Sequence, residues 1–386
     1  MKILMLLRFY GDHLKWFYGK NPGLGRLSYL EHKERIAREN FSWPLRLLRY
    51  ASEKGFSSDF IVVNDIPLQR KWVAENGADE RSWEKTVAEQ IKRLKPDILW
   101  IDGIFDLYGD FIKEISGYAG KVVTWIALPF RKEIDPRGIS VLFTENPGTY
   151  AGYHDRFEKV IVLKPGFDGE VLKLLGSPEK EHDITFIGTI SPSHAERADT
   201  LAFLIRNGID IDVFGRMDQP GFLSDVKAIL SDMVRKRKGR DIGKVSPEGK
   251  DILREYVKNC EVIRTKHRGP LYDLEMYKTL ARSKLTLNTH IGLACRYSGN
   301  MRMYEATGSG ACLVTEGFEN TPELFEPGKE ILTYSHKEEL LDKLKDIIIG
   351  KKWKETGMVA KEGQKRTIRD YNMERLFEKV KPALEL

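Results

Sequence analysis

The chain has 386 residues, of which 41% are hydrophobic and 31% are charged. This composition supplies enough apolar side chains for a folded core and excludes a mainly disordered chain. The formal net charge of +6 is too small to indicate nucleic acid as a partner, although it permits an anionic one.

Short apolar segments alternate with longer amphipathic segments along nearly the whole chain. The apolar segments are rich in β-branched residues and apolar on both faces, which is typical of parallel strands covered by helices. The predicted strands are 2–7, 60–64, 97–101, 122–127, 141–144, 160–163, 184–187, 210–214, 285–288, 311–315 and 331–334. The predicted helices are 44–54, 81–94, 195–207, 272–282, 299–307, 337–349 and 373–386. This alternation predicts doubly wound α/β domains.

Residues 164–182 are rich in glycine, proline and charge, which predicts a linker between two α/β halves of similar size. The three cysteines, Cys260, Cys295 and Cys312, have no CxxC spacing, which disfavours a disulfide framework and a zinc ribbon. The eight histidines are scattered, so we expect no metal site. No apolar run approaches the roughly 18 residues of a membrane span. We therefore expect a cytoplasmic protein, with peripheral contact at the inner membrane face left open.

Known nucleotide motifs are missing from the sequence. No G-x-x-x-x-G-K-[ST] pattern occurs, which disfavours a Walker-type NTPase. One basic run, at 235–240, stands out. Such runs are usually solvated, and contact with anionic lipid or a phosphorylated carrier is the alternative.

Residues 285–315 predict a strand, a loop, a helix that Gly299 opens, and a second strand. The free N–H groups at a helix start bind phosphate oxygens. Arg302 and Glu305 are three residues apart and share a helix face. The arginine suits a diphosphate, and the glutamate suits the hydroxyls of a ribose. The alternative is an ordinary intrahelical ion pair, worth about 0.2–0.5 kcal/mol.

A second junction of strand, glycine and helix covers 184–197, and Gly188 ends its strand. Ligands of α/β folds bind where strands end in this way. Arg197 would lie near such a ligand, or would be a surface charge. His290 follows the strand that ends at Asn288. It could contact a phosphate or a sugar, or simply cap the loop.

The first half of the chain offers three candidates for a catalytic base. Asp12 and His13 follow the first strand, and Asp102 ends another. Histidine titrates near neutral pH, so His13 is slightly preferred. The alternative for His13 is an exposed loop residue.

These segments resemble glycosyltransferases of the B-type fold (GT-B), and in particular the CgeB-like group. The matching segments are FYGKNPGLGRLSYLEHK, LQRKWVAENGAD, ITFIGTISPSHAER, GPLYDLEMYKTLARSKLTLNTH, NMRMYEATGSGACLVTE and ELFEPGKEILTYSHKEEL. The resemblance implies two Rossmann-like, doubly wound parallel-sheet domains that face a cleft. Residues 1–168 would form the acceptor side and 169–365 the donor-binding domain, with a terminal helix at about 366–386 packing back on the first domain.

The resemblance also assigns residues to the donor site. Glu305 would hold the ribose, and the backbone of Gly299, Asn300 and Met301 would meet the diphosphate. Gly188 and Thr189 match the glycine loop, and Gly269 to Tyr272 the segment beside the nucleobase; Arg197, Asn288, His290 and Arg302 complete the set. Many retaining enzymes of this fold carry a glutamate where this chain has Tyr297. That departure leaves open how the sugar is held and whether transfer inverts or retains configuration.

The sequence therefore predicts a glycosyltransferase that needs no metal and holds no permanently bound cofactor. Its donor would be a nucleoside-diphosphate sugar, with a UDP-sugar favoured and GDP- or dTDP-sugars as alternatives. Its acceptor would be a hydroxyl of a glycan, a lipid-linked carrier, a protein or a small molecule. Three alternatives remain: a nucleotide-sugar epimerase, a non-catalytic coat or binding protein that kept the fold, and a DNA-modifying glucosyltransferase that only the run at 235–240 favours.

Overall fold

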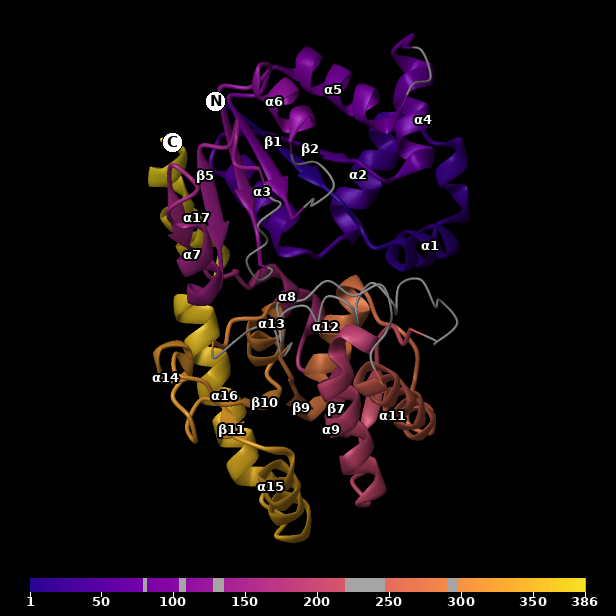
Figure 1. Ribbon diagram of the computed structural model, residues 1–386, viewed down its shortest axis with the longest axis vertical. Coiled ribbons are helices and arrows are strands. Elements are labelled where there is room, and N and C mark those ends of the chain that lie inside the picture. The colour runs from indigo at the N-terminus through magenta and orange to yellow at the C-terminus, as the bar shows by residue number, and fades with distance from the viewer. Residues whose placement is uncertain (79–81, 104–108, 128–134, 219–246, 291–296, 386) are drawn as a thin grey trace. The chain divides into compact units, whose positions relative to one another are not determined.

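The computed structural model describes residues 1–78, 82–103, 109–127, 135–218, 247–290 and 297–385 (Figure 1). The chain divides into two compact units. The first comprises Met1–Gly169 together with Asp370–Leu386, and the second comprises Glu170–Arg369. Each unit contains one parallel β-sheet with helices packed against it.

The first unit has a six-stranded sheet in the order β2-β1-β3-β4-β5-β6. The strands are β1 Lys2–Leu7, β2 Ser57–Val62, β3 Ile98–Asp102, β4 Lys121–Trp125, β5 Val141–Thr144 and β6 Val160–Val162. The helices are α1 Gly11–Lys20, α2 Tyr29–Glu39, α3 Trp43–Glu53, α4 Ile66–Glu75, α5 Trp83–Leu94, α6 Asp110–Ser116, α7 Pro147–Tyr153 and α17 Met373–Leu384. A 3₁₀ turn covers Pro22–Arg26.

Strand β1 is buried on both faces, as its unbroken apolar sequence predicts. Leu4 and Leu6 pack in one cluster with Ile91 of α5. Met5 points to the other face, where Phe377 of α17 and Tyr50 of α3 have ring centroids 5.6 Å apart. The C-terminal helix α17 therefore belongs to the first unit, although 200 residues of the other unit separate it from β6 and the segment after it.

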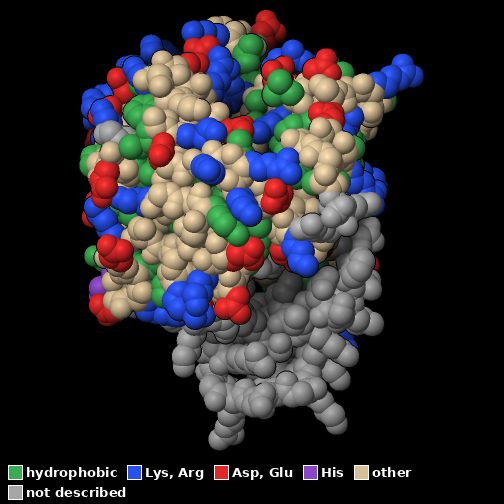
Figure 2. Space-filling view, turned by 90° about the horizontal axis from the view of Figure 1, so that it is seen from above, with side chains coloured by type: hydrophobic (Ala, Val, Ile, Leu, Met, Phe, Trp, Pro, Cys, Tyr) green, Lys and Arg blue, Asp and Glu red, His purple; other side chains and the backbone are tan. Residues whose placement is uncertain are grey.

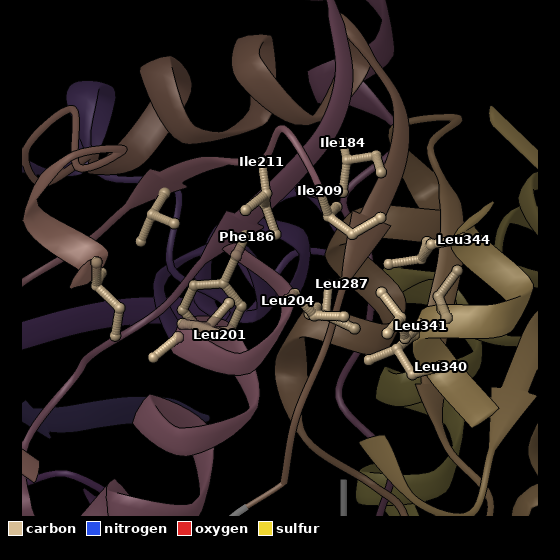
Figure 3. Packing of buried hydrophobic residues seen from close by; sticks show 14 of the residues in the cluster. Ile184, Phe186, Leu201, Leu204, Ile209, Ile211, Leu287, Leu340, Leu341 and Leu344 are labelled. Carbon is tan, nitrogen blue, oxygen red and sulfur yellow. The ribbon is translucent and has the colours of Figure 1, made fainter. Parts of the chain in front are cut away.

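The second unit has a five-stranded sheet in the order β11-β10-β9-β7-β8. The strands are β7 His182–Ile187, β8 Asp212–Phe214, β9 Ser283–Leu287, β10 Cys312–Glu316 and β11 Leu332–Tyr334. The helices are α8 Glu170–Leu175, α9 Ala195–Arg206, α11 Pro247–Arg264, α12 Asp273–Ala281, α13 Met301–Gly308, α14 Thr321–Leu324, α15 Lys337–Ile349 and α16 Trp353–Asp370. Figure 3 shows side chains of β7, β9, α9 and α15 packing in one apolar cluster, which fixes these strands and helices relative to one another.

Two expectations from the sequence are wrong in detail. Residues 164–182 are not all linker, because helix α8 lies within them and the Phe167 N–H donates to the Tyr371 carbonyl at 2.6 Å. The predicted loop after the first strand is short, because helix α1 begins at Gly11. Among the described residues, no helix is long and apolar enough to cross a membrane.

In each sheet the strand order reverses once. From β1 the chain builds β2 on one side and then β3 on the other, and from β7 it builds β8 and then β9 in the same way. Ligands of open α/β sheets bind outside the carboxyl ends of the strands at such reversals. Ligand sites are therefore expected at the carboxyl ends of β1 and β3 in the first unit, and of β7 and β9 in the second.

Replacing Gly215 with Ala should destabilise the second unit strongly. Gly215 follows β8 at φ +137°, and an added Cβ would lie 1.9 Å from the Gly188 carbonyl oxygen. We expect the free energy of unfolding to fall by about 3 kcal/mol, because both the contact and the backbone conformation reject a side chain. Chemical denaturation measures this.

Gly357→Ala is the matched control for that variant. Gly357 lies in α16 of the same unit, and an added Cβ there would meet nothing within 4 Å. Alanine should raise stability by up to about 1 kcal/mol, through helix propensity alone. Equal effects of the two substitutions would contradict the close approach of Gly215 to Gly188.

Candidate functional site

Most of the predicted donor residues gather at one edge of the second sheet. Gly188 and Thr189 directly follow β7, and Asn288 and His290 follow the neighbouring strand β9. Helix α13, which carries Arg302 and Glu305, begins beyond the same edge (Figure 1). The structure therefore brings residues separated by more than 100 positions to the reversal point of the sheet.

Arg197 of α9 joins the two strand ends. Its guanidinium donates to the Thr189 carbonyl at 2.5 Å, and to the Oγ1 and the carbonyl of Thr289 at 2.8 and 3.0 Å. The pKa of Arg197 is lowered to about 10, chiefly by burial; nearby Arg302 contributes to the decrease and Glu316 opposes it. The residue is thus a partly buried cation that organises the edge, and not a surface charge.

Arg302 and Glu305 form an ion pair at 2.8 Å, with side chains only 17% and 13% exposed. The Arg302 Nε–H also donates to the carbonyl of Ile187, the last residue of β7, at 3.1 Å. The pair is therefore more than an exposed intrahelical contact, because it ties α13 to the end of β7. Together with Arg197 it places two partly buried guanidinium groups at one edge, where an anionic group would compensate their desolvation.

A chain of side-chain amides fixes the turn before α13. The Asn300 amide donates to the Asn288 Oδ1 at 2.9 Å, and the Asn288 amide donates to the Thr315 Oγ1 at 3.0 Å. The helix begins at Met301 with Asn300 as its N-cap, two residues later than predicted, because Gly299 has φ +151° and cannot be helical. The Asn300 Oδ1 is buried and has no hydrogen-bond partner in the structure described.

His290 is held by a residue that the sequence did not single out. One carboxylate oxygen of Glu316, Oε2, lies 2.5 Å from the His290 backbone nitrogen and 3.0 Å from its Nδ1. The ring is buried and meets Phe318 edge-on, with centroids 5.1 Å apart. Glu316 ends β10, beside β9, so its position at a strand end was the available signal.

The segment 269–272 lies farther along the same edge. The Gly215 N–H donates to the Gly269 carbonyl at 2.9 Å, and Gly269 has φ +93°. Tyr272 is the N-cap of α12. This segment therefore continues the site past β7 toward β8.

In the first unit, the loop position predicted for Asp12 and His13 is wrong. Both residues lie in the first turn of α1. The His13 ring is buried, with its centroid 5.2 Å from that of Phe9 and 5.9 Å from that of Trp16. The packing of His13 among aromatic rings makes it a poor candidate for a base that must reach a substrate.

Asp102 does end its strand as predicted, at the reversal point beside β1. Desolvation by burial raises the pKa of its carboxyl to about 7. Glu145, which follows β5, has its pKa raised to about 8 by burial. The sequence reasoning did not find Glu145, because a single glutamate after a strand carries no local sign of burial.

Surface charges of both signs are mixed. On the face drawn in Figure 2, Lys and Arg side chains are interspersed with Asp and Glu. The basic run at 235–240 lies outside the described residues. Among those described, no three His, Cys, Asp or Glu side chains are grouped as metal ligands would be.

Comparison with known proteins shows a family match in the C-terminal half and a similar fold. Residues 224–381 match the family described as "Glycosyl transferase-like". No curated protein matches the sequence.

The fold is similar to three solved structures, each covering 100% of this chain. AviGT4, a glycosyltransferase involved in avilamycin A biosynthesis, is 12% identical, with 97% of its chain covered and a TM-score of 0.57. A glycosyltransferase from Rickettsia africae ESF-5 is 10% identical, with 97% covered and a TM-score of 0.56. Anabaena HepE in complex with UDP-glucose is 12% identical, with 99% covered and a TM-score of 0.54.

The two parallel-sheet units and the structural neighbours confirm the predicted GT-B fold with Rossmann-like units. The family match in the C-terminal half, taken with that fold, confirms the predicted enzyme class: this is a glycosyltransferase.

Proposed function

We propose that the chain transfers a sugar from a UDP-sugar to an acceptor hydroxyl, and that the second unit holds the donor. The observation that carries this proposal is the pair of partly buried arginines, Arg197 and Arg302, at the reversal point of the second sheet. A diphosphate carries negative charge that the two guanidinium groups can bind. UDP is the favoured nucleotide because the similar Anabaena HepE has been solved with UDP-glucose.

The other donor contacts follow from position. The N-terminus of α13, at Asn300 and Met301, would face the diphosphate with its free N–H groups. Glu305, one turn later, would accept hydrogen bonds from the ribose hydroxyls. The segment 269–272 would lie beside the base, and Gly188 would let the ligand approach the backbone after β7.

Asp102 is our candidate for the base that activates the acceptor hydroxyl, in place of His13. A carboxyl whose pKa is about 7 can accept a proton near neutral pH and is matched to that task. Asp102 also lies at the reversal point of its own sheet, where ligands of this architecture bind. The first unit would accordingly receive the acceptor.

A thermal-shift series with UDP-glucose, GDP-glucose and dTDP-glucose tests the donor assignment. A ligand at about 100 times its dissociation constant adds about 2.7 kcal/mol to the free energy of unfolding. We expect the largest increase in melting temperature with UDP-glucose. A larger increase with GDP- or dTDP-glucose would show that the donor carries guanine or thymine in place of uracil. No increase with any of the three would contradict the proposal.

Transfer should proceed without a divalent metal. The charge that develops on the departing diphosphate would be stabilised by the two arginines and the start of α13. We expect turnover in EDTA to stay within about twofold of turnover without it, because these groups already supply the electrostatic stabilisation. Turnover that is lost in EDTA and restored by Mn²⁺ would contradict this expectation.

A further inference from the structure

The contact between Glu316 and His290 fixes both a backbone segment and a ring. A single oxygen, Glu316 Oε2, accepts the His290 backbone N–H at 2.5 Å and faces Nδ1 at 3.0 Å. The His290 side chain is only 4% exposed. The imidazole therefore has one orientation, set by the carboxylate at the end of the adjacent strand.

This contact also determines which ring nitrogen carries hydrogen. An ionised carboxylate only accepts hydrogen bonds, so Nδ1 must be the donor. In the neutral ring the lone pair then lies on Nε2, which becomes an acceptor. The Nε2 atom is buried and has no hydrogen-bond partner among the described residues. A buried unpaired acceptor is costly, so this position is suited to a donor that a ligand brings.

A hydroxyl fits this position and a phosphate does not. The oxygens of a diphosphate have no hydrogen to give to a lone pair, whereas every sugar hydroxyl has one. The preceding residue, Thr289, already binds the Arg197 guanidinium through its Oγ1 and its carbonyl. Arg197 is therefore positioned to bind the charged part of a donor. The imidazole of His290, the residue after Thr289, is positioned to bind a neutral part.

We propose that Glu316 is a positioning residue that holds His290 with Nε2 as the acceptor for a hydroxyl of the transferred sugar. This inference rests on the proposed function, since it names a contact within the same donor site. It also supplies a way to hold the sugar in a chain that has Tyr297 where the resemblance leads one to expect a glutamate.

Two substitutions of His290 separate the roles of its nitrogens. The Asn side chain of His290→Asn can still reach Glu316 but lacks an acceptor where Nε2 lies, whereas the Gln of His290→Gln can place its amide oxygen near that position. Titration calorimetry with UDP and with UDP-glucose is the measurement. For His290→Asn we expect about threefold to tenfold weaker binding of UDP-glucose, the effect of one hydrogen bond, with unchanged binding of UDP. His290→Gln should recover part of the loss.

Two substitutions of Glu316 test the positioning role. Glu316→Gln keeps an oxygen that can accept both N–H groups, so UDP-glucose binding should stay within about twofold of the wild type. Glu316→Leu removes the acceptor, and should weaken UDP-glucose binding selectively, as His290→Asn does. Wild-type protein that binds neither ligand would instead defeat the proposed function itself.

Two results would overturn the inference while leaving the proposed function intact. In the first, His290→Asn or Glu316→Leu weakens UDP and UDP-glucose by the same factor, which means that the pair serves the nucleotide or only the fold. In the second, His290→Asn leaves the binding of both ligands unchanged.

Discussion

Replacing Asp102 with Asn should lower turnover by roughly 10²–10⁴-fold, the usual contribution of a general base. Asparagine keeps the size of the side chain and removes its ability to take a proton. The affinity for UDP should not change, because the donor is assigned to the other unit. Steady-state kinetics with UDP-glucose and an accepted hydroxyl compound, together with calorimetry for UDP, measures both quantities.

The pH dependence gives an independent check on Asp102. Since burial raises its pKa to about 7, the base form is scarce below that pH, and wild-type turnover should rise through about pH 7 and then level off. The folded protein also holds this proton more tightly than the unfolded chain, whose aspartate has a pKa of 3.8. The contribution of the Asp102 carboxyl to the free energy of unfolding is therefore fully present below pH 3.8. It is lost as the pH rises toward about 7.

Asp102→Asn should consequently be at least as stable as the wild type at pH 8, where the wild type carries a partly buried charge at this position. A large loss of stability at that pH would make the kinetic loss a folding effect. Near-normal turnover of Asp102→Asn would instead pass the role of general base to Asp12.

Replacing Glu305 with Gln should weaken UDP binding by about 10- to 100-fold, the value of hydrogen bonds to a charged group. Glu305 lies one turn past Met301, the first residue of α13, and its carboxylate is 2.8 Å from Arg302. The substitution removes the negative charge that would accept the ribose hydroxyls and also loosens the ion pair. Titration calorimetry with UDP measures the total effect.

A ligand lacking the ribose hydroxyls separates these two causes. If Glu305 holds the ribose, 2′,3′-dideoxy-UDP should bind the wild type weakly and Glu305→Gln about equally weakly, because the contact is absent from both. If the substitution weakens UDP and dideoxy-UDP by the same factor, Glu305 acts only through Arg302.

The strands were predictable because parallel strands covered on both faces carry continuous apolar segments. All eleven predicted strands are present, with ends displaced by up to three residues. Helices that contain glycine were harder to predict from the sequence. Helix α16 contains Gly363, where a Cβ would lie 2.3 Å from the Glu330 carbonyl oxygen. The glycine that lowers helix propensity is thus required by tertiary packing, which a local reading cannot show.

The grouping of the candidate donor residues was predictable where one segment carries several of them. Gly188 and Arg197 lie in one segment and Arg302 and Glu305 in another, and both segments reach the same edge of the second sheet. The Glu316–His290 contact joins residues 26 positions apart on neighbouring strand ends. Predicting it would have required the strand order. His13 was misplaced because no local pattern around it indicates that helix α1 begins as early as Gly11.

Hydrogen–deuterium exchange with and without UDP-glucose tests most directly whether the donor binds at the reversal point of the second sheet. We expect slower exchange in peptides that cover 187–197 and 298–305, the segments after β7 and at the start of α13. Peptides from helix α5 of the first unit should exchange at unchanged rates. Protection confined to the first unit, or none at a UDP-glucose concentration that raises the melting temperature, would contradict the assignment.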